Sequence, residues 1–144
     1  MKTVVVGVGN VLRGDDGAGV EVVRCLRVRG NLTAELIDAG SVPENYLGPI
    51  TRSRPALVII IDAADMGCPP GTVREVDSET ADWPAFSTHS ASLTPLVEFV
   101  RSECDARVRV IGVQPHTREL GAHMSPAVIA AVNRVVEMLE MQVE

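Results

Sequence analysis

A run of aliphatic residues at positions 56–62, Ala-Leu-Val-Ile-Ile-Ile-Asp, constrains the fold more than any other part of the chain. Apolar residues fill this run without interruption up to Asp62. Such a strand is typical of the centre of a parallel sheet, where helices cover both faces. The segment Lys2–Val8 has nearly the same character. The two runs together predict central strands of an α/β protein.

Strand-like and helix-like segments alternate along the rest of the chain, as they do in α/β proteins. We predict strands over residues 2–8, 34–38, 56–62, 72–77 and 108–113, and helices over 18–29, from 41 to before 55, up to about 103, and from 126 onward. No helix precedes strand 72–77 to form a parallel crossover, so this strand is predicted to be antiparallel and at an edge. The predicted fold is a three-layer α/β/α domain spanning residues 1–144. Its sheet is twisted, mostly parallel and five-stranded, with one antiparallel edge strand and helices on both faces.

Several residues suggest where the helices begin. Asp15 or Asp16 is predicted to cap the first helix, because a carboxylate accepts hydrogen bonds from the amides of a first turn. The Ser-Val-Pro-Glu sequence at 41–44 has capping-box spacing, and Ser125 followed by a proline predicts the start of the last helix. The last helix is expected to bury one apolar stripe, formed by Val128, Ile129, Val132, Val135, Val136 and Leu139.

Composition excludes several classes of function. The net charge of −6 argues against a nucleic-acid partner or an anionic membrane surface. No apolar run reaches the roughly 20 residues of a membrane span, and the N-terminal segment reads as a strand rather than a signal peptide. The three cysteines are widely spaced and odd in number, which predicts reduced, structural thiols in a cytoplasmic protein.

Acidic residues are expected to gather at one edge of the sheet. In a doubly wound sheet, ligands bind at the carboxyl ends of the strands where the winding reverses, here between strands 2–8 and 56–62. Asp16, Asp38 and Asp62 all follow or end strands that point to this edge, and His89 lies in a loop that can reach it. Each residue alone has a simpler interpretation, as a cap, a turn residue or a surface histidine. Together they predict a possible site for a divalent ion such as Ni²⁺ or Zn²⁺.

Other kinds of site find less support in the sequence. The glycines at 7, 9 and 14 do not form G-x-G-x-x-G, no Gly-Lys-Ser/Thr sequence is present, and two aspartates would repel phosphate from the first helix. A serine nucleophile lacks the G-x-S-x-G elbow, and no cysteine has an evident neighbouring base. His116 and His123 are weaker ligand candidates than His89.

Motifs along nearly the whole chain resemble the [NiFe]-hydrogenase maturation endopeptidases, and the hydrogenase 3 type most of all. The segments that carry the resemblance are 8–10 (Val-Gly-Asn), 13–19 (Arg-Gly-Asp-Asp-Gly-Ala-Gly), 38–45 (Asp-Ala-Gly-Ser-Val-Pro-Glu-Asn), 62–67 (Asp-Ala-Ala-Asp-Met-Gly), 70–71 (Pro-Gly), 88–89 (Thr-His) and 112–115 (Gly-Val-Gln-Pro). The resemblance implies an endopeptidase that removes the C-terminal extension from the nickel-loaded precursor of a hydrogenase large subunit. It also implies an aspartic-type grouping.

The family pattern places Asp16, Asp62 and His89 in contact with nickel, and Asp38 at a position implicated in activity. The catalytic candidates implied by the resemblance are therefore Asp16, Asp38 and Asp62. We expect nickel to arrive with the precursor, no organic cofactor to be needed, and the enzyme to be a monomer. The alternative is a non-catalytic, chaperone-like module that binds the precursor in a metal-dependent way without cutting it.

Overall fold

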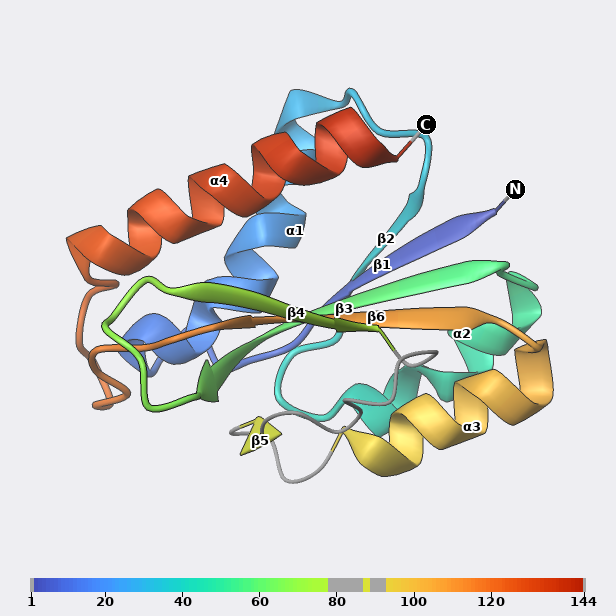
Figure 1. The fold of residues 1–144 in the computed structure, drawn as a ribbon, viewed down its shortest axis with the longest axis horizontal. Helices are drawn as coiled ribbons and strands as arrows, with labels where there is room; N and C mark the ends of the chain where they lie inside the picture. Colours follow the sequence, from blue (N-terminus) through green and yellow to red (C-terminus); the bar gives the residue numbers. More distant parts are fainter. Residues whose placement is uncertain (1, 78–86, 89–92, 144) are drawn as a thin grey trace.

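The computed structural model describes residues 2–77, 87–88 and 93–143. Its sheet has the strand order β2-β1-β3-β6-β4 (Figure 1). The strands of this path are β1 (Thr3–Gly7), β2 (Glu35–Asp38), β3 (Leu57–Asp65), β4 (Val73–Asp77) and β6 (Arg107–Val113). All neighbours on this path pair in parallel except β4, which is antiparallel to β6 at the edge. The predicted mostly parallel sheet with one antiparallel edge strand is confirmed.

Helices cover both faces of the sheet (Figure 1). The helices are α1 (Ala18–Arg29), α2 (Leu47–Arg52), α3 (Thr94–Cys104) and α4 (Pro126–Gln142), and two 3-10 turns, η1 (Gly14–Gly17) and η2 (Pro43–Tyr46), precede α1 and α2. In Figure 1, α1 and α4 lie above the sheet, and α2 and α3 lie below it. None of the helices in the described part of the chain is long and apolar enough to span a membrane.

The aliphatic run of β3 is divided between the two faces. Ile59 and Ile61 pack into the cluster that includes α1 and α4, while Val58 and Ile60 pack into the cluster that includes α3. All four side chains are completely buried. Burying each one contributes roughly 1.5–3 kcal/mol to folding. Because both faces of β3 need apolar side chains, the run carries no polar alternation.

The order of the strands places the reversal of winding between β1 and β3. From β1 the chain crosses to β2 on one side, and β3 then pairs with the other side of β1. The two-residue strand β5 (Ser87–Thr88) pairs with the end of β3, which extends beyond β1. The carboxyl ends of β1 and β3 therefore form the predicted crevice edge.

Some local predictions were wrong. The segment after 41 does not start a helix with a capping box: η2 begins at Pro43, with Val42 as a cap that makes no side-chain hydrogen bond, and α2 starts only at Leu47. Pro43 favours a first turn, and Pro49 near the start of α2 divides the segment into short pieces. In α4 the expected stripe is buried except for Ile129, which is 48% exposed.

Candidate active site

The glycines of the β1–α1 connection allow the helix to approach the sheet very closely. A Cβ atom on Gly19 would lie 2.0 Å from the Ile61 carbonyl oxygen, and one on Gly9 would lie 1.9 Å from the Asp16 carbonyl oxygen. Gly9 also has φ +146°, a conformation that other residues rarely adopt. Only glycine fits at these two contacts. Backbone packing therefore explains the glycines of this segment without a bound phosphate.

Asp16 lies in η1, directly at the carboxyl edge of the sheet. Its side chain is 6% exposed, and its Oδ2 accepts a hydrogen bond of 3.0 Å from the amide of Asn10. The guanidinium Nε of Arg118 lies 3.8 Å from Oδ1. The prediction that Asp15 or Asp16 caps α1 was wrong, because Gly17 occupies the cap position and no side chain bonds there. The turn η1 continues directly into α1, so Asp15 and Asp16 lie before the cap position. Their carboxylates bond to other parts of the chain instead.

Asp62 is the second buried carboxylate at this edge, with no exposed surface. Asp62 was predicted to be the last residue of its strand. This was wrong, because β3 continues to Asp65. Its backbone pairs with Gly112 of β6, one position past the point where Gly7 ends β1 opposite Ile61. β3 extends further because β5 and β6 supply partners after β1 has ended. Asp62 therefore lies at the reversal point of the sheet.

The other two predicted residues differ from this pair. Asp38 ends β2 at the same edge but is exposed, and its Oδ1 accepts a 3.0 Å hydrogen bond from the amide of Gly40 in a local turn. His89 lies outside the described residues. Its predecessor Thr88 pairs with Ala64, two positions beyond Asp62. Within the described part of the chain, no three His, Cys, Asp or Glu side chains form a group able to hold a metal.

Asp15, the neighbour of Asp16, is an anchor for the loop after β6. It is fully buried and accepts hydrogen bonds from the amides of His116 (2.8 Å), Thr117 (3.1 Å) and Ser125 (2.7 Å) and from the Ser125 hydroxyl (2.9 Å). Burial alone would raise the pKa of this carboxyl, but the hydrogen bonds outweigh it and hold the pKa below its ordinary value. Ser125 stands at the predicted cap position of α4, yet its hydroxyl serves Asp15.

Gln114 is a structural residue that the sequence analysis did not identify. Its buried Oε1 accepts hydrogen bonds from the amides of Met66 (2.6 Å) and Cys68 (3.4 Å), and its Nε2 donates to Asp65 at 3.3 Å. These bonds fix the loop that follows β3. A glutamine directly after an apolar strand, in the Gly-Val-Gln-Pro sequence, is the signal that would have indicated it.

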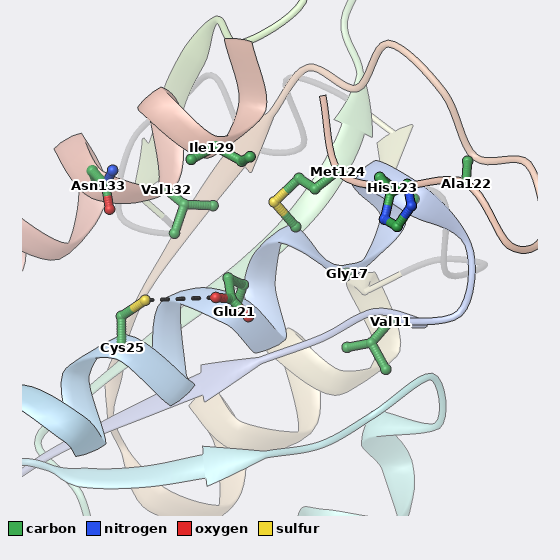
Figure 2. A pocket seen from close by; sticks show the side chains of 11 residues that line it. Val11, Gly17, Glu21, Cys25, Ala122, His123, Met124, Ile129, Val132 and Asn133 are labelled. Carbon is green, nitrogen blue, oxygen red and sulfur yellow. Dashed lines mark hydrogen bonds between the residues drawn. The ribbon is translucent and has the colours of Figure 1, made fainter. Parts of the chain in front are cut away.

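A pocket of about 390 Å³ opens between α1, α4 and residues 122–124. Figure 2 shows Val11, Met124, Ile129 and Val132 around it, with Cys25 on the α1 side. The pocket lining includes none of the three predicted aspartates. It is therefore separate from the carboxylate edge, although the loop that carries Asp16 contributes to its wall.

Two of the three cysteines, Cys25 and Cys104, do not resemble nucleophiles. All three thiols are free, as predicted. Burial raises the pKa of the Cys25 thiol, and the Glu21 carboxylate, whose Oε1 lies 3.8 Å from Sγ, raises it further. Burial also raises the pKa of the Cys104 thiol. These two cysteines are therefore protonated at neutral pH, and thiol chemistry is disfavoured there.

Two buried carboxylates at one edge can act in two chemical ways. Carboxylate oxygens are ligands for divalent cations, and a carboxylate can take a proton from water during hydrolysis. Asp16 comes from the β1–α1 connection and Asp62 from β3. The close contact of Gly19, at the start of α1, with Ile61 of β3 brings these two segments together. The site is thus built from the glycine-rich connection and the reversal point of the sheet.

The family model for hydrogenase maturation protease (HycI) matches residues 20–142. The hydrogenase 3 maturation protease of Escherichia coli is 34% identical over 143 residues, which covers 97% of this chain and 90% of that protein.

Solved structures agree with this match. A crystal structure of a hydrogenase 3 maturation protease superposes with a TM-score of 0.85 and 31% identity, covering 98% of this chain and 90% of the other. The [NiFe] hydrogenase maturation protease HycI from Thermococcus kodakarensis gives a TM-score of 0.84 at 27% identity, covering 97% and 90%. The chain therefore belongs to the hydrogenase maturation protease family, and it is a hydrolase.

Proposed function

We propose that this protein removes a C-terminal extension from the nickel-loaded precursor of a [NiFe]-hydrogenase large subunit. The observation that carries the proposal is the pair of buried carboxylates, Asp16 and Asp62, at the reversal point of the sheet. Membership of the maturation protease family supplies the reaction class. The preference for the hydrogenase 3 type of substrate follows the likeness to the hydrogenase 3 maturation protease.

In this proposal the nickel belongs to the substrate and serves as the recognition element. Asp16, Asp62 and His89 contact it, and this contact aligns the precursor so that its C-terminal segment crosses the edge of the sheet. A precursor without nickel offers no cation to Asp16 and Asp62, so it loses the carboxylate–metal contacts and docks poorly. Cleavage is thereby conditional on nickel insertion. No organic cofactor takes part.

Hydrolysis adds one water molecule across the scissile peptide bond. A carboxylate at the edge accepts a proton from the water molecule while the water oxygen attacks the carbonyl carbon. The carboxylic acid then gives this proton to the leaving amine. Asp16 and Asp62 are the candidates for this role, because both are buried beside the proposed docking position. Asp38, exposed at the same edge, is proposed as a further participant.

Mass spectrometry of the precursor after incubation tests the proposal. Wild-type enzyme is expected to shorten nickel-loaded precursor and to leave nickel-free precursor intact. Asp16→Asn, Asp62→Asn and His89→Ala are each expected to reduce cleavage by at least about 100-fold. Asp105→Asn is the matched control: this residue caps the end of α3 with φ 51°, a conformation that asparagine tolerates, and it should cleave like wild type.

Two outcomes would contradict the proposal in different ways. Wild-type protein that fails to cut a nickel-loaded precursor, when a known relative cuts it, would refute the protease function. An uncut precursor held in a stable, nickel-dependent complex would instead favour the non-catalytic binding module. Full cleavage by His89→Ala would remove this histidine from the site.

A further inference from the structure

Arg118 lies in the loop between β6 and α4, and the backbone around it is fixed against η1. The amide of the preceding residue, Thr117, donates to Asp15, and the Thr117 carbonyl accepts a 2.9 Å hydrogen bond from the Asp15 amide. Further along the same loop, the amide of Gly121 donates to the carbonyl of Leu12 at 2.8 Å. The backbone of Arg118 is therefore held in a defined position beside the carboxylate edge.

The side chain of Arg118 reaches Asp16 without closing an ordinary ion pair. Its Nε lies 3.8 Å from Asp16 Oδ1, and the two side chains are 25% and 6% exposed. The Nε and Nη2 atoms are shielded from solvent, and neither makes a hydrogen bond within residues 2–77, 87–88 and 93–143. Shielding two donors of a charged group from solvent without hydrogen bonds is energetically costly, so the arrangement is unusual for a purely structural arginine.

In other arginines of this protein, the Nε and Nη2 groups both donate to a carboxylate. Arg107, for example, donates from Nε to Asp77 at 2.7 Å, and its Nη2 bonds to the same oxygen. At Asp16 the amide of Asn10 already holds Oδ2, which fixes the orientation of the carboxylate. Arg118 consequently acts on Asp16 through charge at a short distance rather than through a closed pair of hydrogen bonds.

The positive charge of Arg118 also extends toward the end of β3. The pKa of the Asp65 carboxyl lies below its ordinary value, first because the amide of Gly67 and the side chain of Gln114 donate to it, and with a smaller contribution from Arg118. The charge of Arg118 thus acts on Asp16 directly and on the end of β3 more weakly. It is a resident cation at an edge that buries two carboxylates.

We propose that Arg118 is a positioning residue whose charge weakens the binding of free divalent ions at Asp16, which leaves the site open for a metal ion carried by a precursor. This inference rests on the proposed function. A hydrated ion must overcome repulsion from the guanidinium with its carboxylate contacts alone. An ion held in a precursor arrives with the surface contacts of the partner, which offset the same repulsion. Arg118 thereby lowers the occupancy of the site by loose metal, while loaded substrate keeps enough affinity to bind.

Calorimetric titration of the metal-free enzyme with NiCl₂ measures this effect directly. Removing a unit charge a few ångströms from a divalent ion, at an effective dielectric constant near 20, predicts that Arg118→Gln binds Ni²⁺ at least about 10-fold more tightly than wild type. Arg118→Lys keeps the charge and is expected to stay within about 3-fold of wild type. Arg101→Gln is the control, since this arginine lies 3.7 Å from Glu98 in α3. It should bind like wild type.

Each outcome decides the question. The inference would be overturned if Arg118→Gln bound Ni²⁺ no more tightly than wild type. It would also be overturned if Arg118→Gln and Arg118→Lys bound Ni²⁺ equally tightly, or if no variant showed measurable binding. A merely structural arginine would give weaker binding together with lost stability. If Arg118→Gln does not fold in urea-unfolding controls, Arg118→Met takes its place. A failed titration with intact precursor cleavage overturns this inference alone, whereas the expected titration without any cleavage overturns the proposed function alone.

Discussion

Replacing Gly19 with alanine tests how closely α1 must approach the sheet to place Asp16. Gly19 lies in the first turn of α1. An added Cβ would lie 2.0 Å from the carbonyl oxygen of Ile61 and 2.6 Å from that of Val8. Both are backbone atoms, of Ile61 in β3 and of Val8 directly after β1, so neither can turn aside as a side chain would. The helix must therefore move away from the sheet.

The size of the effect follows from the distances. A carbon and a carbonyl oxygen normally remain about 3.3 Å or more apart, so the start of α1 must retreat by roughly 1 Å. Overpacking of this kind costs about 1–3 kcal/mol and occasionally more. Alanine offsets up to about 1 kcal/mol of that cost because its helix propensity is higher than that of glycine. We expect Gly19→Ala to lower the free energy of unfolding by about 2 kcal/mol, with a further loss of cleavage because Asp16 moves with the helix.

Urea unfolding of Gly19→Ala beside Gly48→Ala separates packing from helix propensity. Gly48 is also helical, but its Cβ would meet only the end of the flexible Arg52 side chain, at 2.9 Å. Gly48→Ala should therefore leave stability unchanged or raise it by up to about 1 kcal/mol. Equal stabilities of the two variants, or a Gly19→Ala protein as stable as wild type, would refute the close-contact reasoning.

Three further predictions concern Asp15, Gln114 and the cysteines. The folded pKa of Asp15 lies below the ordinary value of 3.8, so its ionised form stabilises the fold above that pH, and this stabilisation is lost as the pH falls through the folded pKa. Urea unfolding of Asp15→Asn should show lower stability at pH 7 and a smaller loss than wild type between about pH 5 and pH 2. Gln114→Ala leaves two loop amides without their acceptor and should cost about 1–3 kcal/mol, with faster hydrogen exchange at residues 66 and 68. Replacing Cys25, Cys68 and Cys104 together by alanine should leave cleavage of the precursor within about 3-fold of wild type, and a complete loss would return thiol chemistry to consideration.

Much of the layered fold was predictable because burial on two faces leaves a clear pattern in the sequence. The uninterrupted run at β3 exists because alternate residues meet different helix layers. The antiparallel edge position of β4 follows from the missing crossover helix before Val73. The positions of Asp16 and Asp62 were predictable for the same reason, since parallel strands bring their carboxyl ends to one edge.

The remaining features depend on contacts between distant parts of the chain. Asp15 and Asp16 have the residue type of helix caps, but Asp15 bonds to residues 116–125, about a hundred positions away. Local propensity contains no information on such partners. Gln114 and Arg118 were missed because both owe their roles to how the loop after β6 lies across other segments. Their residue types alone are common on surfaces.

The adjacent residues Asp15 and Asp16 show how one turn serves both the fold and the site. In η1, successive side chains leave the backbone in different directions, so one carboxylate enters the loop before α4 while the next faces the edge of the sheet. The buried Asp15 fixes Thr117 and thereby the start of the segment that carries Arg118 back toward Asp16. Asp15 therefore influences the charge environment of Asp16 through the placement of Arg118. Any change to the loop after β6 should then alter the behaviour of Asp16, even though the two lie about a hundred residues apart in the chain.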